Sequence, residues 1–253
     1  MSLTSFALRF ASPPPEIEKC ERFLFVGPHP DDIEIGAGAT AAKLAAMGKA
    51  VCFLVCTDGR YGSETVPPEE LIPLRRAEAQ KSAELLGVRD LRFLDLCDGG
   101  FYSEEELCRG IAGVIGDFAP DLVFAPDPCV ASECHTDHLR VGRAASRAAY
   151  FAPYSGVAAH MGAAPAPVKG IAYYMTARPN RYVKTDEALF KTQLSSVLDC
   201  HLSQFDKTAG KALALYLRLR SVDFGLRRFA LHAEGFRCIS ALGMHCMPES
   251  DFI

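Results

Sequence analysis

Residues 25–38 read FVGPHPDDIEIGAG, a run in which an apolar stretch passes directly into a cluster of polar side chains. The apolar residues predict a short buried strand over residues 22–26. His29, Asp31 and Asp32 follow the end of that strand. One imidazole and two carboxylates at a strand end can hold a divalent cation and still leave one carboxylate free as a base. This is the minimum equipment for metal-assisted hydrolysis.

Strands and helices are predicted to alternate along the rest of the chain. The further predicted strands are 51–57, 91–96, 121–125, 171–175, 182–183 and a short one near 236–239. The predicted helices are 37–48, 68–87, 103–118, 137–150, 186–200 and one near 210–219. Alternating strands and helices form βαβ units, so the sequence predicts an α/β fold with a three-layer, doubly wound, mostly parallel and Rossmann-like sheet.

The chain is expected to form a single domain over residues 1–253, because it contains no internal repeat and no low-complexity linker. Residues 1–20 contain ASPPPE and are predicted to be an irregular N-terminal arm. Residues 152–168 are rich in Ala, Gly and Pro, which favours a surface loop and makes this segment a candidate lid over the site. GAGAT at 36–40 lacks the full dinucleotide fingerprint, so close backbone packing is the favoured interpretation.

The composition is that of a core-forming globular protein, with 49% hydrophobic residues and a net charge of −4. The negative charge and the lack of a Lys/Arg cluster argue against a nucleic-acid partner. No apolar run reaches transmembrane length, so no membrane partner is expected. The ten cysteines are scattered without a CxxC pair, and no secretory leader is evident. Reduced thiols and a cytoplasmic location are therefore expected.

A second polar cluster, ECHTDH, follows the fourth predicted strand and contains His135, Asp137 and His138. In a doubly wound sheet of order 3-2-1-4-5 the first and fourth strands are neighbours. Both clusters would then overlook one crevice at the carboxyl ends of the strands. His29, one of the two aspartates of the first cluster and one of the two histidines of the second would supply an open metal site. Asp137 is placed to orient a neighbouring imidazole.

The chain resembles the LmbE-like, or PIG-L, family of zinc-dependent N-acetylglucosamine deacetylases from about residue 23 to its C-terminus. The resemblance rests on PHPDD and the downstream HTDH, and it extends to TDGRYG, RRAEAQKSAELLGV, APDP and HLSQF. Among the branches of this family the chain is most similar to the diacetylchitobiose deacetylases, and the tail EGFRCISALGMH adds to that similarity.

The resemblance implies a role for each candidate residue. It makes His29, Asp32 and His138 the ligands of Zn²⁺ or another divalent transition metal. It makes Asp31 the general base and His135 the group that stabilises the oxyanion or acts as an acid. The remaining matches are expected to contact the substrate: Arg75, Asp98 and, in the pocket of a neighbouring subunit, His245. A homo-oligomer, either a trimer or a hexamer, would follow from that last role.

The sequence departs from the family pattern at two places. Many members carry an acid directly after the aspartate pair, whereas Ile33 intervenes here before Glu34. The segment DLCDGGF around Asp98 also differs, which affects substrate detail more than chemistry. His201, in HLSQF, is expected to brace the site.

The resemblance implies a hydrolase that removes the N-acetyl group from an N-acetylglucosamine-containing saccharide, such as diacetylchitobiose, and releases acetate. Two alternatives remain. One is a related amidase that acts on a sugar–thiol conjugate or an antibiotic precursor. The other is a non-catalytic sugar-binding relative, which would need neither a base nor an oxyanion donor.

Overall fold

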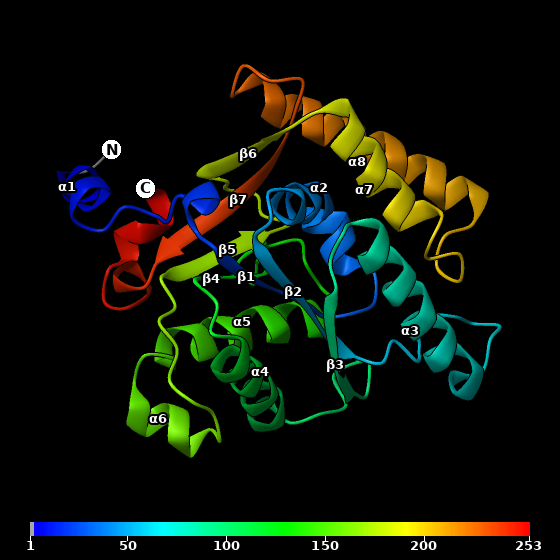
Figure 1. Ribbon diagram of the computed structural model, residues 1–253, viewed down its shortest axis with the longest axis horizontal. Helices are drawn as coiled ribbons and strands as arrows, with labels where there is room; N and C mark the ends of the chain where they lie inside the picture. The colour runs from blue at the N-terminus through cyan, green and yellow to red at the C-terminus, as the bar shows by residue number, and fades with distance from the viewer. Residues whose placement is uncertain (1–2) are drawn as a thin grey trace.

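The computed structural model describes residues 3–253 and is built on a seven-stranded sheet with helices on both faces (Figure 1). The strands are β1 (Arg22–Gly27), β2 (Ala50–Thr57), β3 (Asp90–Leu96), β4 (Leu122–Pro126), β5 (Gly170–Tyr174), β6 (Arg181–Thr185) and β7 (His232–Ser240). Their order is β3-β2-β1-β4-β5-β7-β6. The first five strands are parallel, while β7 runs antiparallel to β5 and to β6. The predicted order of the parallel strands and the α/β fold are confirmed.

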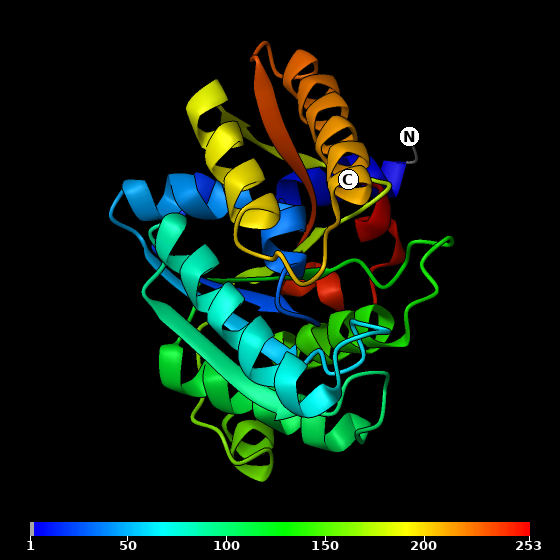
Figure 2. The same ribbon diagram turned by 90° about the vertical axis from the view of Figure 1, so that its right-hand side faces the viewer.

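The helices cover the two faces of the sheet in separate layers. They are α1 (Leu3–Ala11), α2 (Asp32–Ala46), α3 (Pro68–Leu85), α4 (Glu104–Phe118), α5 (Thr136–Phe151), α6 (Ser155–His160), α7 (Glu187–Leu198) and α8 (Lys207–Leu226). Short 3₁₀ helices lie at Ile17–Lys19, Leu242–Met244 and Pro248–Phe252. Helices α4 and α5 lie on one side, and α2, α7 and α8 lie on the other, as the two views agree (Figures 1 and 2).

The apolar run of β1 serves both layers. Leu24 and Val26 are buried in the cluster that includes α4 and α5, whereas Phe23 and Phe25 are buried in the cluster that includes α2. Alternate residues of a strand point to opposite faces, so a strand covered on both sides is apolar at every position. This is why the sequence shows a continuous run here. The strand then ends under the polar cluster that begins at His29.

The expectation of an irregular arm over residues 1–20 is wrong for Leu3–Ala11, which forms helix α1. This segment contains no Gly or Pro, and Leu8 is buried, so the chain can remain helical until the prolines at 13–15 end it. Ser12 anchors the end of the helix through a hydrogen bond to Ser240 on β7.

The expectation of a site lid at residues 152–168 is also wrong. Part of this segment is helix α6, and the segment leads into β5 beside the start of β4. The N–H of Lys169 donates to the carbonyl of Asp121 over 2.7 Å, which places the segment at the amino edge of the sheet. The carboxyl ends of the parallel strands, where ligands bind in such sheets, lie at the opposite edge.

Helix α2 begins at Asp32, earlier than the sequence predicts, because it consists of two helical pieces that meet at a break at Ala37 (φ −153°, ψ 16°). Gly36 and Gly38 flank the break. A Cβ atom at Gly36 would lie 2.2 Å from the Tyr174 ring, and one at Gly38 would lie 3.0 Å from Gln193. The predicted close packing of GAGAT is therefore confirmed.

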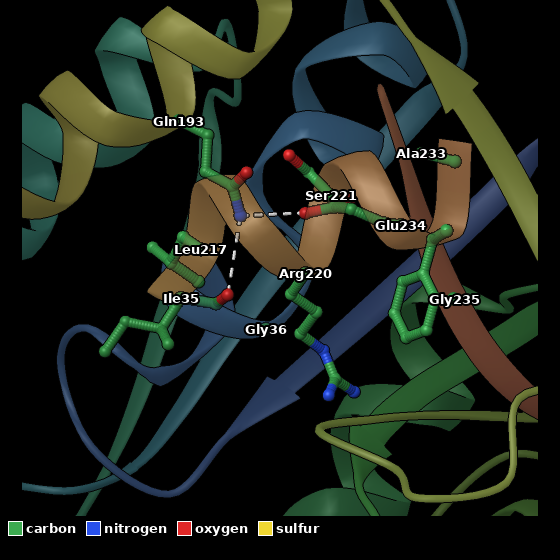
Figure 3. Close-up of a pocket in the computed structure, with 10 residues that line it drawn as sticks. Ile35, Gly36, Gln193, Leu217, Arg220, Ser221, Ala233, Glu234 and Gly235 are labelled. Carbon is green, nitrogen blue, oxygen red and sulfur yellow. Dashed lines mark hydrogen bonds between the residues drawn. The ribbon is translucent and has the colours of Figure 1, made fainter. Parts of the chain in front are cut away.

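Two side chains replace the backbone hydrogen bonds lost at the break (Figure 3). The Gln193 side-chain amide donates to the carbonyl of Glu34 over 2.9 Å and to Glu234 Oε1 over 2.8 Å. The Glu234 carboxylate accepts the N–H groups of Ala39 (3.3 Å) and Thr40 (2.6 Å). An acid at the exposed N–H groups of a helix start is a favourable cap. Glu234 thus caps the second piece of α2 from β7.

Glu234 gives a prediction for stability against pH. Burial raises its pKa from 4.5 to about 7, although the donors at the helix start and Gln193 oppose the rise. The folded state therefore holds a proton that the unfolded state has lost, and stability falls as pH rises through this window. Relative to Glu234→Gln, the wild-type free energy of unfolding is expected to drop by about 2–3 kcal/mol between pH 5 and 8.

Chemical denaturation of both proteins at the two pH values measures this difference. Glu69→Gln, at the exposed start of α3, is the matched control and is expected to follow the wild type. A constant difference between wild type and Glu234→Gln across this range would contradict the prediction.

Candidate active site

The loops that follow β1, β3 and β4 bring the predicted residues together at the carboxyl edge of the sheet. His29 follows β1, Asp98 follows β3, and His135 and His138 lie at the start of α5 after β4. The His29 ring centroid lies 4.7 Å from that of His135 and 5.5 Å from that of His138. The prediction that both histidine clusters overlook one site is confirmed.

Asp32, on the first turn of α2, lies between two imidazoles. Its Oδ2 accepts the His29 backbone N–H over 2.9 Å and lies 3.0 Å from His29 Nδ1. Its Oδ1 lies 3.3 Å from His138 Nε2. One potential ligand atom from each of His29, Asp32 and His138 lies within 4.8 Å of the other two. Two nitrogens and an oxygen at this spacing are a donor set that a divalent transition metal accepts.

The opposite nitrogen of each imidazole faces a carboxylate. His29 Nε2 lies 3.1 Å from Asp98 Oδ1 and 3.2 Å from Asp137 Oδ2. His138 Nδ1 lies 3.1 Å from Glu133 Oε2, an ion-pair distance without the alignment of a hydrogen bond. Metal-binding histidines typically present one nitrogen to the cation and donate the other N–H to a carboxylate. These residues therefore fit a bound cation.

The buried charges stabilise one another. Burial disfavours the ionised form of Asp32, but the neighbouring His138 and His29 outweigh it and hold the pKa of Asp32 well below its usual range. Burial likewise opposes protonation of His29, but its contacts with Asp137, Asp32 and Asp98 raise its pKa well above the usual value. Binding of a cation would displace protons from these imidazoles, so metal affinity is expected to weaken at low pH.

Asp137 is completely buried at the start of α5 and is held from three sides. Its Oδ1 accepts the Tyr102 hydroxyl over 2.7 Å, and its Oδ2 accepts the Gly99 N–H over 2.9 Å. Burial opposes ionisation of Asp137, but the hydrogen bonds from His29, Tyr102 and Gly99 keep its pKa well below normal. His135 lies beside it, with Nδ1 3.8 Å from Asp137 Oδ2.

Asp31 stands apart from the imidazoles and pairs with an arginine. Arg75 Nη2 lies 3.3 Å from Asp31 Oδ2, and the guanidinium also donates to the carbonyls of Gly59 (3.1 Å) and Pro30 (3.4 Å). Arg75 is 3% exposed, so it reaches the site from beneath Asp31. Gly59 and Gly62 make room for it, because a Cβ atom at either would lie 2.5 Å from Arg75 Nη1.

The Asp31 carboxyl is suited to exchange a proton near neutral pH. Burial raises its pKa to about 6, the neighbouring Arg75 opposes the rise, and Asp32 adds to it. A general base works best with a pKa close to the operating pH. A bound cation nearby would lower this value further.

Behind the first turn of α2 lies a buried polar cluster that includes His201. Glu34 Oε1 accepts the Ser82 hydroxyl over 2.6 Å and lies 3.4 Å from His201 Nε2. The three side chains come from α2, from α3 and from the loop after α7. They tie these elements together directly behind Asp31 and Asp32, which matches the bracing role expected for His201.

His245 does not line the site of its own chain. Its ring stacks on Tyr150, with centroids 5.5 Å apart and planes at 11°. Tyr150 lies at the end of α5, twelve residues beyond His138, which corresponds to about 18 Å along the helix. The role of His245 in a neighbouring subunit stays a prediction.

Sequence reasoning missed three residues that hold the site. Tyr102 and the backbone of Gly99 fix Asp137, and Glu133 faces His138. Tyr102 and Gly99 follow the third strand, and the only available signal is their closeness to Asp98 in the chain. Glu133 lies two residues before His135, so its place beside the second cluster could have been noticed.

Comparison with known proteins follows the same motifs. The family model described as "PIG-L: GlcNAc-PI de-N-acetylase" matches residues 24–149. The chain is 31% identical to the diacetylchitobiose deacetylase of Thermococcus kodakarensis, over 92% of this chain and 88% of that protein. The chain belongs to the PIG-L family of de-N-acetylases. Its PHPDD and HTDH motifs are the two clusters that meet at His29.

Two further relatives span the PIG-L family. The crystal structure of N,N'-diacetylchitobiose deacetylase from Pyrococcus horikoshii, in complex with an inhibitor, matches with a TM-score of 0.85 at 32% identity, covering 94% of this chain and 90% of that one. The 1D-myo-inositol 2-acetamido-2-deoxy-alpha-D-glucopyranoside deacetylase of Kineococcus radiotolerans is 33% identical, over 59% of this chain and 50% of that protein. The first of these similarities extends over nearly the whole fold.

Helices long and apolar enough to cross a bilayer do not occur among residues 3–253.

Proposed function

We propose that this PIG-L family member is a metal-dependent hydrolase that removes the acetyl group from an N-acetylglucosamine unit of a saccharide such as diacetylchitobiose. One observation carries the proposal. Asp31, a buried carboxylate with a raised pKa, lies directly beside the His29–Asp32–His138 group but is not part of it. Hydrolysis of an amide needs such a base, whereas a binding protein does not.

The residues divide the reaction among them. His29 Nδ1, Asp32 and His138 Nε2 would hold Zn²⁺ or a related divalent metal, which supplies Lewis-acid polarisation of a carbonyl and a lowered pKa of bound water. Asp31 accepts the proton of the water that adds to the acetyl carbon. His135 donates to the acetyl oxygen as its negative charge develops. The C–N bond then breaks as the sugar nitrogen gains a proton, giving acetate and a free amine.

The other predicted residues serve binding and position. Asp98 would accept a sugar hydroxyl. Arg75 is assigned to hold the Asp31 carboxylate, because its guanidinium lies against that carboxylate and two backbone carbonyls. The diacetylchitobiose substrate is favoured by the extent of the similarity to the deacetylases named for it. A single domain, a cytoplasmic location and a trimer or hexamer in which His245 closes a neighbour's pocket complete the proposal.

Metal removal tests the function directly. Treatment with a chelator is expected to abolish acetate release from N,N'-diacetylchitobiose, and one equivalent of Zn²⁺ is expected to restore it. Acetate is measured enzymatically after the chelator has been dialysed away. A panel of N-acetylated sugar–thiol conjugates and acylated antibiotic precursors separates the related amidases. A metal-loaded protein that releases no acetate from any of these substrates would indicate a non-catalytic relative.

A further inference from the structure

Two buried carboxylates converge on the side of His29 that faces away from Asp32. Asp98 Oδ1 and Asp137 Oδ2 lie 3.1 Å and 3.2 Å from His29 Nε2. His135 lies beside them, and one potential ligand atom from each of these four residues falls within 4.8 Å of the others. This second group shares only His29 with the His29–Asp32–His138 group. It consists of residue types that bind divalent transition metals.

Both carboxylates are held in place before any ligand binds. Asp98 Oδ2 accepts the Tyr61 N–H over 3.2 Å, which leaves Oδ1 directed at the shared point. Asp137 is held by the Tyr102 hydroxyl and the Gly99 N–H. These donors are neutral, so they orient the carboxylates without cancelling their charge. Fixed ligand oxygens with such supporting hydrogen bonds are typical of metal sites.

The negative charge of this group lacks a permanent counter-charge. Within residues 3–253, the ion pairs of Asp98 and Asp137 are formed with histidines, whereas Asp31 has Arg75. If a cation occupies Nδ1 of His29, that ring keeps one proton, on Nε2, for two carboxylates. Buried carboxylates that share one N–H are costly and favour a further positive charge. Each carboxylate oxygen has two lone pairs, so it can accept from His29 and bind a cation as well.

We propose that Asp98, His135 and Asp137 form a second, weaker site for a divalent transition-metal cation, and that its occupation inhibits the enzyme. The inference rests on the proposed function, because that function assigns Asp98 to the sugar and His135 to the acetyl oxygen. A cation bound there withdraws both groups from the substrate. Repulsion from the first cation makes this site the weaker of the two.

Metal stoichiometry is the primary test. The metal-free full-length protein is titrated with Zn²⁺ by equilibrium dialysis, and with Co²⁺ by visible absorption. Two equivalents are expected, the second binding about 100-fold more weakly. Acetate release should rise with the first equivalent and fall with the second, and the inhibition should be relieved by raising the substrate concentration. Binding of a single equivalent at saturation would overturn the inference.

Variants assign each equivalent to its residues. Asp98→Asn is expected to bind only the tight equivalent, and Asp32→Asn is expected to lose the tight one. Since Asp98 is buried, His135→Ala at a more exposed position repeats the test with less risk to folding. Asp117→Asn, on an exposed part of α4, is the matched control and should bind both equivalents.

A second equivalent retained by both Asp98→Asn and His135→Ala would overturn the assignment. Failure of the proposed function has a different signature. In that case the wild type with one equivalent of metal releases no acetate, whatever number of cations it binds.

Discussion

Asp31→Asn is expected to lower kcat for deacetylation by about 10²–10⁴-fold, because it removes the group that accepts the proton from water. The metal content is expected to stay the same, since His29, Asp32 and His138 form their own group of ligand atoms. Asparagine has nearly the same shape as aspartate and can still contact Arg75. The measurements are the initial rate of acetate release and the metal content after dialysis.

The pH profile gives this prediction a second readout. The wild-type rate is expected to fall as pH drops through the pKa of Asp31, which lies at about 6 without a cation and lower with one. The residual rate of Asp31→Asn should lack that acid limb. Asp223→Asn, at an exposed position of α8, is the control for loss of one carboxylate. Near-wild-type turnover by Asp31→Asn would rule out the role assigned to Asp31.

Arg75→Met is expected to have the second-largest effect, because it leaves the buried Asp31 carboxylate without its counter-charge. Loss of a neighbouring arginine raises a carboxyl pKa by about 1–3 units, so the acid limb of the rate should move to higher pH by that amount. At pH 7 the rate is expected to fall about 10–100-fold and to recover partly at pH 9. The free energy of unfolding should fall by about 3 kcal/mol.

Arg75→Lys separates position from sugar binding. Lysine keeps the positive charge beside Asp31 but cannot hold the carbonyls of Gly59 and Pro30 with the same fork of donors. The acid limb should therefore stay near its wild-type position while kcat falls modestly. If Arg75 instead acts only on the sugar, both variants will raise KM and leave the acid limb where it is. Rate–pH profiles at saturating substrate distinguish the two outcomes.

The parallel part of the sheet could be predicted from the sequence because each strand is an apolar run followed by a helix. The alternation sets the order of β1 to β5, and this order places the two motifs side by side. The start of α2 could not be predicted. The break at Ala37 depends on Gln193 and Glu234, which come from α7 and β7 far along the chain. Tertiary capping of this kind leaves no local pattern.

The site shows the same division between local and distant contacts. His29, Asp31, Asp32, His135 and His138 lie in two short motifs, so their meeting follows from strand order. Arg75 and Asp98 were identified by resemblance alone, since nothing near them in the chain shows what they face. The structure adds that Arg75 lies beneath Asp31. That contact depends on how the loop after β2 folds over α3, which periodicity cannot indicate.

The break in α2 has a consequence for how the reactive end of the helix can vary between relatives. An unbroken helix would transmit any shift of its far turns directly to Asp32. Here the first turn is joined to the rest through the amide of Gln193 and the carboxylate of Glu234, two side chains on the outer layer. Substitutions at these remote positions can therefore reposition the aspartate pair by fractions of an ångström, while every residue that meets the substrate stays the same.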